Sequence, residues 1–436
     1  MSLEEAGVPT VAVHTHVFAR LSKAAALARG MPTTRQAYVP QPLVGRTPAQ
    51  LRDYVEGVDP ISKRPFMQGV IEGLSAPLND DDHKGATFER SRARLLEPDS
   101  EDHQQELFMR ERWTDFLPIV LPTEARVAAM LKGTKRSPEE VIAHLAPTNF
   151  REAWAITVEK VAVNAVMAGA RPEYLPVILA MVATATTAKN SSTTSFAGLA
   201  VVNGPIRNQI GMNCGIGATG PYSHANVTIG RAWSLASQNG QGGSTPGESY
   251  MGSLGNSNSY SLCIAENEER SPWAPLAARY GAKAEESTVT TFRGARYMQS
   301  GFGPRATWQE KFKRVFAANA ARQQALLVMD PIVARGFADL GFDSKQKLID
   351  WIAENCTIPA REYWDDQWVQ TLLHPLAVAG VEPYATNLKA APDAPLKLLL
   401  PNEINIVVTG GETQGAWRVY EATRAKDATV SVDAWR

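Results

Sequence analysis

Residues 201–231, VVNGPIRNQIGMNCGIGATGPYSHANVTIGR, constrain the fold of this chain more than any other segment. Glycine and proline recur along them, and both residues weaken helices and strands, so no long core element fits most of the stretch. The segment carries no acidic residue but many single hydrogen-bond donors, which is unlike a solvated linker. We expect a loop-built pocket in which backbone amides, asparagine amides and guanidinium groups converge on a small polar or anionic molecule.

The composition is that of a globular protein, with 44% hydrophobic and 20% charged residues. At 436 residues the chain has room for roughly two or three domains. A formal net charge of −1 argues against a basic surface for nucleic acid or a membrane. The cysteines are widely spaced, no signal-peptide pattern is visible, and no apolar stretch reaches the roughly 20 residues of a membrane span. We therefore expect a soluble, cytoplasmic protein that binds neither nucleic acid nor membranes.

The order of predicted elements indicates an α/β fold in two parts. A strand at 8–15, a helix at 17–29, a strand at 36–39 and a helix opened by Thr47-Pro48 predict a small α/β unit over residues 1–78. Residues 79–114 are charge-dense and predict a linker or a partner-contact arm. Residues 115–436 then form a larger α/β domain with long glycine-rich pocket loops.

Within the larger domain, hydrophobic patterns and helix caps predict a series of alternating elements. Two passages, PIVLPTEARVAAML and LLVMDPIVARGFADL, resemble one another and suggest two similar halves. Residues 240–259 are rich in glycine and serine and predict a long loop. Strands are predicted at 116–122, 199–205, 261–269, 287–292 and 404–408, and helices at 123–132, from Ser137, at 158–167, 172–188 and 229–237.

Polar residues that follow predicted strands are the candidate ligand contacts. Asn203 and Arg207 lie at the carboxyl end of a strand, where ligands bind in open α/β sheets. Arg207 and Arg231 could each clamp a carboxylate or phosphate through two hydrogen bonds. The alternative is that both arginines pair with structural acids such as Glu266 or Glu268.

The glycines of CGIGATG resemble a loop that cradles phosphate, and a helix from about Asn226 would add a positive N-terminal dipole. The GxGxxG pattern there lacks a strand–helix–strand context and an acidic residue about 20 positions further on, so it does not predict a dinucleotide site. Asn213 and Asn226 are the residues expected to orient polar atoms of the ligand.

Three kinds of residue could carry out chemistry. Cys214 lies close to a predicted helix N-terminus, which can activate a thiol, and His224 could act as its base; the alternative is that Cys214 is a small buried hydrophobic residue. Glu266 follows a strand in a run of carboxylates and is either a proton-transfer group or part of a solvated charge run. Gly410 and Gly411 form either a second anion-binding turn or a simple tight turn.

His14 and His16 alternate near the end of the first predicted strand, which would place both on one face. This spacing occurs in zinc sites, although a third ligand is required. His83, His103 or the acids at 80–82 could supply it by folding back. The chain could accordingly be a metal-dependent hydrolase or lyase.

Several segments together resemble the UGSC-type (seleno)protein family, and the N-terminal part is distantly similar to the selenoprotein subunits of glycine and betaine reductases. The family implies an α/β N-terminal unit and a redox motif of selenocysteine or cysteine followed by Gly-Ser-Cys. The segments that carry the resemblance are AGVPTVAVHTHVFARLSKAAALARGMP, VPQPLVGRTPAQLRDYVEG, VEKVAVNAVMAGARPEYLPVILA, VVNGPIR, HANVTIGRA, CIAENEERSPW and INIVVTGGE.

Two departures from the family pattern limit what this resemblance implies. The redox motif would precede the first strand, and the chain starts too late to contain it; the turn expected as Pro-His-Pro-Leu is Pro40-Gln41-Pro42-Leu43. Cys214 stands where the family has serine or another small residue. A sheet edge left without its strand is a liability. We therefore expect a second subunit that supplies the missing strand and its cysteine motif.

The sequence thus predicts an enzyme, or the substrate-binding subunit of a heteromeric enzyme, that acts on a small polar or carboxylated metabolite. Thiol-assisted redox or carbon–heteroatom bond chemistry is the expected reaction, and no cofactor is assigned. The alternatives are the metal-dependent hydrolase or lyase that uses His14 and His16, and a non-catalytic scaffold subunit.

Overall fold

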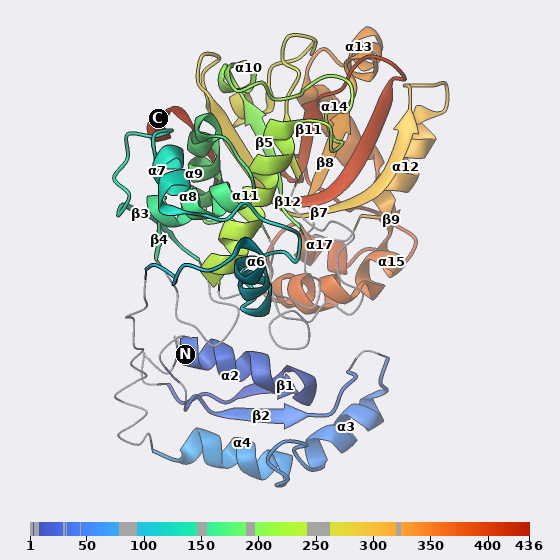
Figure 1. The fold of residues 1–436 in the computed structure, drawn as a ribbon. Coiled ribbons are helices and arrows are strands. Elements are labelled where there is room, and N and C mark those ends of the chain that lie inside the picture. Colours follow the sequence, from blue (N-terminus) through green and yellow to red (C-terminus); the bar gives the residue numbers. More distant parts are fainter. Residues whose placement is uncertain are drawn as a thin grey trace.

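The chain has an α/β fold with a small N-terminal unit and a large curled mixed sheet (Figure 1). The computed structural model describes Leu3, Met31 and residues 8–28, 33–43, 45–77, 94–145, 155–188, 197–241, 262–319 and 324–436.

The N-terminal unit, blue in Figure 1, is built on two parallel strands, β1 (Ala12–Thr15) and β2 (Gln36–Val39). Helix α2 (Ala19–Ala28) connects them, and α3 (Pro48–Glu56) and α4 (Phe66–Ser75) follow. The predicted start of α3 is confirmed: the Thr47 hydroxyl accepts from the Gln50 amide, and the Gln50 side chain accepts from the Thr47 amide.

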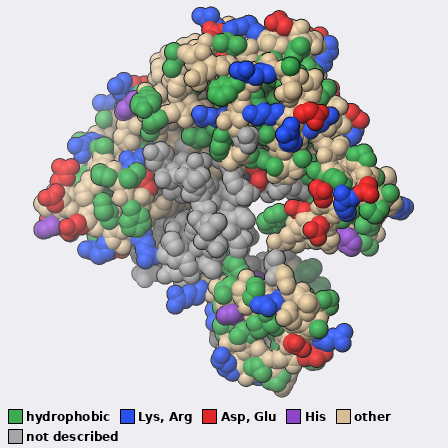
Figure 2. Space-filling model, turned by 90° about the vertical axis from the view of Figure 1, so that its right-hand side faces the viewer, with side chains coloured by type: hydrophobic (Ala, Val, Ile, Leu, Met, Phe, Trp, Pro, Cys, Tyr) green, Lys and Arg blue, Asp and Glu red, His purple; other side chains and the backbone are tan. Residues whose placement is uncertain are grey.

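This unit has a small core and many exposed apolar side chains. Ala37, Val39 and Phe66 are buried together. Hydrophobic side chains lie at the surface of the unit, at the bottom of Figure 2, and Val13 of β1 is 51% exposed. A two-stranded parallel sheet is unusual on its own, because parallel sheets are normally covered on both faces.

The larger domain contains a six-stranded sheet of order β11-β8-β12-β7-β5-β6. The pairs β5–β6 and β8–β11 are parallel, and the long strands β7 and β12 run antiparallel to each other between them. The strands are β5 (Leu199–Asn203), β6 (Leu262–Ala265), β7 (Thr288–Phe302), β8 (Ala325–Met329), β11 (Ile404–Val408) and β12 (Ala416–Ser431).

The sheet is made of two halves with the same strand order. In each half a strand leads through a Pro-Ile step into a helix, β5 into α10 (Ile206–Gln209) and β8 into α13 (Pro331–Asp339). A longer helix follows, α11 (His224–Gln241) or α14 (Lys345–Asn355). The sequence predicted two similar halves from the likeness of PIVLPTEARVAAML to LLVMDPIVARGFADL. The first of these two segments was the wrong one, because residues 116–122 form no strand. The segment that matches β8–α13 is β5–α10.

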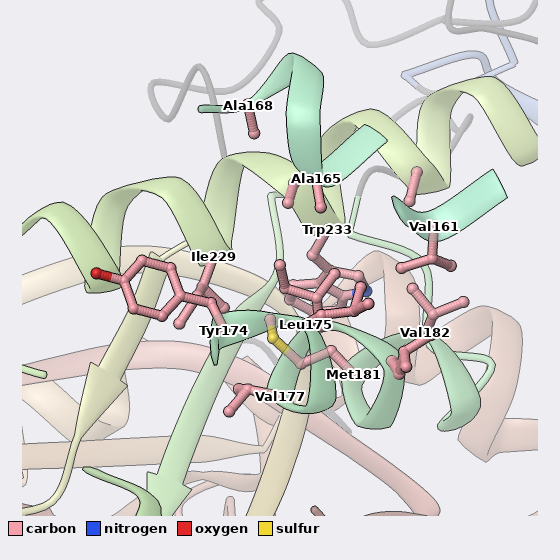
Figure 3. Packing of buried hydrophobic residues seen from close by; sticks show 14 of the residues in the cluster. Val161, Ala165, Ala168, Tyr174, Leu175, Val177, Met181, Val182, Ile229 and Trp233 are labelled. Atoms are coloured by element: carbon pink, nitrogen blue, oxygen red, sulfur yellow. The ribbon is translucent and has the colours of Figure 1, made fainter. Parts of the chain in front are cut away.

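Helices cover the outer faces of both halves. Helices α8 (Val158–Met167) and α9 (Leu175–Ala183) pack with α11 around Trp233, as Figure 3 shows. Helices α12 (Trp308–Ala317), α13 and α14 form a second core around Phe312 and Phe337. A third cluster, which includes Val201, lies on the inner face of the curl and takes residues from all six strands. The sheet is thus buried on both faces.

The remaining elements connect or flank these layers. Phe108 of α6 is buried in the core with α8 and α9, so this part of the expected linker at 79–114 packs with the larger domain. These elements are α6 (Glu101–Arg110), α7 (Glu124–Leu131), β3 (Val141–His144), β4 (Ala155–Thr157), β9 (Thr357–Pro359), α15 (Ala360–Asp365), α16 (His374–Val378), α17 (Tyr384–Leu388), β10 (Pro395–Lys397) and the short turns η1 (His16–Phe18), η2 (Pro172–Tyr174), η3 (Leu276–Tyr280), η4 (Val369–Leu373), η5 (Pro401–Glu403) and η6 (Asp433–Trp435).

Several predicted boundaries differ from those observed. No helix begins at Ser137, where a turn leads into β3, and α11 begins at His224 rather than at residue 229. Strand β7 continues ten residues beyond its predicted end at 292, and β12 was not predicted. Residues 242–259 of the predicted long loop and 79–93 of the predicted linker lie outside the described residues. None of the helices that the structure describes has the length and hydrophobicity needed to cross a bilayer.

Candidate functional site

The carboxyl ends of β5, β6 and β11 meet at one place. The Asn267 amide donates to the Val408 carbonyl at 2.7 Å, and the Thr409 hydroxyl donates to the Ala265 carbonyl at 2.8 Å. We call the polar residues gathered there the strand-end cluster. Its members are Asn203, Arg207, Cys214, Glu266, Asn267, Glu268, Glu269, Lys345 and Gly410.

Glu266 lies at the centre of the cluster and is 0% exposed. Its Oε1 accepts from Lys345 Nζ at 2.5 Å and from the Val408 amide at 3.3 Å. Its Oε2 accepts from Asn203 Nδ2 and from the Leu276 amide, both at 2.7 Å. A carboxylate with four donors and no contact with solvent is a structural anchor, so the geometry argues against the predicted role of Glu266 in proton transfer.

Arg207, on α10, is 2% exposed and is held on all sides. Its Nε donates to the Gly204 carbonyl at 2.9 Å, and Nη1 donates to the Glu266 carbonyl at 2.5 Å. Nη2 lies 3.1 Å from Glu268 Oε2 and 3.0 Å from Glu269 Oε1. The alternative that Arg207 pairs with structural acids is therefore the one observed, and its guanidinium is not free to clamp an anionic ligand.

The two carboxylates that pair with Arg207 differ in environment. Glu268 is mostly buried and also accepts from Asn203 Nδ2 at 2.9 Å and from the Gly204 amide at 2.8 Å. The Glu269 side chain is 55% exposed. The hydrogen bond from Arg207 lowers the pKa of Glu269 to about 2, although partial burial opposes this shift. Both oxygens of Glu269 therefore carry negative charge at the edge of the cluster at neutral pH.

Asn203, the last residue of β5, has one side-chain atom without a partner. Its Nδ2 donates to Glu266 and Glu268, whereas Oδ1 is buried and accepts no hydrogen bond. The residue as a whole is 1% exposed. A buried acceptor left unpaired destabilises the fold unless a donor reaches it. Asn203 Oδ1 therefore marks a position where a ligand could donate a hydrogen bond.

Cys214 is half-buried in the loop that closes the cluster. Burial raises the pKa of its thiol, while the charge of Arg207 opposes the rise and that of Glu269 adds to it. Burial raises the pKa of Cys263 and of Cys356 to about 12. Cys214 is thus a protonated thiol at rest, and the most accessible of the three.

The loop around Cys214 is joined to the turn after β11. The Cys214 carbonyl accepts from the Gly410 amide at 2.9 Å and from Asn267 Nδ2 at 3.3 Å. A Cβ on Gly411 would lie 2.5 Å from the Ile216 nitrogen and 2.6 Å from its Cα. Gly410 and Gly411 therefore form a tight turn packed against this loop, and the Gly410 amide is not available to an anion.

Asn213 and Asn226 hold the same loop in place. Asn226 Oδ1 accepts from the Asn213 amide at 3.0 Å, and Nδ2 donates to the Asn213 carbonyl at 2.9 Å. Asn213 Oδ1 in turn accepts from the Gly215 amide at 2.9 Å. Asn213 and Asn226 were expected to orient polar atoms of a ligand, but their amides build the loop.

Two predicted site residues lie outside the strand-end cluster. Arg231 donates through Nε and Nη2 to Asp115 at 2.9 Å, and through Nη2 to the Pro118 carbonyl at 2.9 Å, so it is a structural residue. His224 is exposed at the start of α11, and its Nδ1 lies 3.4 Å from the Tyr174 hydroxyl. The structure records no contact between His224 and Cys214, and so the pair does not form the predicted thiol and base.

The predicted histidine pair also differs from expectation. His14 lies on β1, where burial lowers its pKa, but His16 begins the η1 turn, so the two are not neighbours on one strand face. His83 and the acids at 80–82 lie outside the described residues. Across the part of the chain that the structure describes, no three histidine, cysteine or acidic side chains are placed to hold a metal ion.

Lys345 is the cluster member that sequence reasoning missed. It begins α14, 79 residues after its partner Glu266 and in the other half of the sheet. The local sequence, with Ser344 as helix cap, indicates only a helix start. Recognising Lys345 would have required knowing that the two halves meet at their strand ends.

Comparison with known proteins gives one match. Residues 1–64 match the model of the UGSC family. The N-terminal unit is of the UGSC type. No curated protein and no solved structure matches the chain. The UGSC match ends within the first unit, so the strand-end cluster lies outside it, and the distant similarity to reductase selenoprotein subunits stays a prediction.

Proposed function

We propose that the strand-end cluster binds a small polar metabolite through hydrogen-bond donors of that molecule, and that the chain is an enzyme or the substrate-binding subunit of one. The observation that carries the proposal is the buried, unpaired Oδ1 of Asn203. It lies beside the carboxylates of Glu266 and Glu268 in a cluster where three carboxylates face the two cations Arg207 and Lys345. Such a site favours an amine, amide or hydroxyl group.

This proposal changes the class of ligand that the sequence suggested. The sequence predicts a small polar or carboxylated metabolite, with Arg207 and Arg231 as clamps for its anionic group. Glu268 and Glu269 occupy the first guanidinium, and Asp115 occupies the second. The local charge balance therefore supports a neutral or cationic donor group rather than an anion.

Cys214 is the proposed reacting group. Burial raises the pKa of its half-buried thiol, and the nearby charge of Arg207 opposes this rise without reversing it. Thiol-assisted redox or carbon–heteroatom bond chemistry is the reaction class that we propose for it. Glu266 and His224 are left out of the proposed chemistry, because the first is saturated with donors and the second lies elsewhere.

We also propose that a second subunit covers the N-terminal unit. The outer side of β2 is occupied, because the Tyr38 amide donates to Asp59 Oδ2 at 2.8 Å. On β1, Val13 is exposed and the buried Thr15 hydroxyl has no partner. An added strand along β1 would use this edge. Size-exclusion chromatography tests the idea, because a monomer that is stable and fully active when made alone would refute it.

Alkylation of the native, full-length protein tests the proposed site. We expect iodoacetamide to modify Cys214 alone, since Cys263 and Cys356 are buried, and intact-mass and peptide mass spectrometry will identify the modified residue. A panel of small amines, amides, alcohols and carboxylates is then screened for slower alkylation. The proposal predicts protection by donor-bearing compounds and none by simple carboxylates.

Two asparagine variants make the test specific. Asn203→Leu should remove the protection, whereas Asn208→Leu should keep it, because Asn208 is exposed and donates only to Glu269 among the cluster residues. Circular dichroism confirms that both variants fold. Equal protection in the two variants, or protection by carboxylates alone, would overturn the proposal.

A further inference from the structure

A second polar site lies on the inner face of the sheet, near the start of β11 and away from the strand-end cluster. Its main cation is Arg424 of β12, which is half-buried. The Arg424 guanidinium stacks on the Tyr280 ring, with Cζ 3.6 Å from the ring centroid. Nε and Nη2 both donate to the neutral Thr429 hydroxyl, at 3.2 and 3.1 Å. No carboxylate among the described residues forms an ion pair with this guanidinium.

Tyr280 connects the guanidinium to a second unsatisfied group. Its hydroxyl donates to Asn405 Oδ1 at 2.5 Å. Asn405 is completely buried, and its Nδ2 has no hydrogen-bond partner. A buried amide donor without an acceptor is rare in folded proteins and calls for a ligand or an ordered water. Tyr280 therefore contacts two groups: its ring stacks on the Arg424 guanidinium, and its hydroxyl bonds to Asn405, whose Nδ2 has no partner.

A further positive charge adds to the same region. Arg279, in the turn before β7, donates to the Ile404 carbonyl at 2.5 Å and to the Pro401 carbonyl at 2.8 Å. Burial lowers the pKa of Arg424, and the charge of Arg279 adds to this effect. Asp427, which is exposed, attracts Arg424 without forming an ion pair with it. Arg279 and Arg424 are thus both half-buried, and no carboxylate of the described residues bonds to either.

We propose that Arg424, Asn405 and Arg279 form a binding site for an oxyanion, either the carboxylate or the phosphate of a small metabolite. Arg424 Nη1 and Asn405 Nδ2 supply the free N–H donors, and the two guanidinium charges supply the attraction. Tyr280 positions the first two by stacking and by hydrogen bonding. This site is opposite in charge to the strand-end cluster, so the two sites would recognise different chemical groups.

Isothermal titration calorimetry on the full-length protein tests this site, with inorganic phosphate and acetate as separate probes. Binding of phosphate alone would assign the site to phosphorylated ligands, and binding of acetate alone or of both would assign it to carboxylates. We expect Arg424→Gln to weaken binding by about 10-fold or more, as the loss of a charge-assisted hydrogen bond implies. Arg64→Gln is the matched control, since Arg64 is an exposed arginine paired with Glu72 in the N-terminal unit.

A second variant keeps the test informative if Arg424→Gln folds poorly. Asn405→Asp places a carboxylate oxygen where the unpaired Nδ2 of Asn405 now lies, so the side chain itself provides the negative charge that a bound oxyanion would bring. We expect this variant to melt at a higher temperature than the native protein in anion-free buffer and to bind neither probe. Binding of neither probe to the native protein, or unchanged binding in both variants, would overturn the proposal.

Discussion

The ion pair between Glu266 and Lys345 allows a quantitative test of how the strand-end cluster is held together. Glu266 is completely buried, and Lys345 supplies its only charged donor at 2.5 Å. The other three donors are the Asn203 amide and two backbone amides, which are neutral. Lys345→Met keeps the aliphatic stem but leaves the carboxylate without a counter-charge. Breaking a buried pair in this way costs about 3–5 kcal/mol.

The expected loss is large enough to measure by calorimetry. An unfolding entropy of about 2.1 cal/mol/K per residue gives a domain of roughly 320 residues a loss of about 1.5 °C in Tm per kcal/mol, so Lys345→Met should lower the Tm of the larger domain by about 4–7 °C. Lys347→Met is the matched control on the same helix. Lys347 is exposed and pairs with the exposed Asp343 at 2.6 Å, so its loss should cost at most about 1 kcal/mol.

A double-mutant cycle separates the pair from general damage to the fold. Glu266→Gln alone should destabilise the domain, because the new amide would face donors and Lys345 would lose its carboxylate. In the double variant both charges are gone, so the combined loss should fall short of the sum of the single losses by about 1–3 kcal/mol. Additive losses, or equal effects of Lys345→Met and Lys347→Met, would refute the view that this pair anchors the two halves.

Three further predictions concern the same region. Arg207 holds the pKa of Glu269 at about 2, below the ordinary 4.5. The ionised carboxylate therefore stabilises the fold above about pH 4.5, and this contribution is lost as the pH falls toward 2. Glu269→Gln should make the fall of Tm between about pH 4.5 and pH 2 less steep. Gly411→Ala should lower the free energy of unfolding in urea by about 1–3 kcal/mol and speed alkylation of Cys214, because the new Cβ would meet the Ile216 backbone. Gly69→Ala is the control and should do neither, because a Cβ at this position on α4 would meet no other atom. Arg231→Met should lower Tm without changing ligand protection of Cys214, and a loss of protection would restore Arg231 to the site.

The local pattern of the sequence was sufficient for most elements of the fold. Strands β2 and β11 and helix α8 were predicted with the observed bounds, because short apolar runs and a threonine cap mark their ends. The prediction failed at 116–122, where an apolar run between prolines contains no strand. It also failed for β12, whose charged residues in ATRAKDAT conceal a strand that pairs on both sides.

The candidate site was predictable in position but not in charge. Asn203, Arg207, Cys214 and Glu266 do gather at the carboxyl ends of strands, as α/β topology predicts. Which donors remain free depends on contacts between residues far apart in the chain. Arg207 is bonded to carboxylates 61 and 62 residues away, and no local pattern could show that its guanidinium was already occupied.

The second half of the sheet provides an internal comparison for the first. Asp330 follows β8 and precedes Pro-Ile, as Gly204 follows β5 and precedes Pro-Ile; the last strand residues are Met329 and Asn203. Both oxygens of Asp330 are satisfied, because Oδ1 accepts from the Ile332 amide at 2.8 Å and Oδ2 from the Glu412 amide at 2.7 Å. Each half also pairs an arginine of the following helix with a glutamate beyond the next strand, Arg335 with Glu412 in the second half.

The two halves therefore share an architecture and differ in the residues at the end of the first strand. In the second half the strand-end acid closes its own turn and leaves nothing unpaired, as a purely structural device should. In the first half Gly204 takes the place of this acid, and the last strand residue is Asn203, whose Oδ1 is buried without a donor. Because β8 ends on Met329, a buried side chain without a polar N or O atom, the unpaired acceptor of Asn203 is not a requirement of the fold. That contrast is the strongest reason to look for a ligand beside Cys214 rather than at the turn after β8.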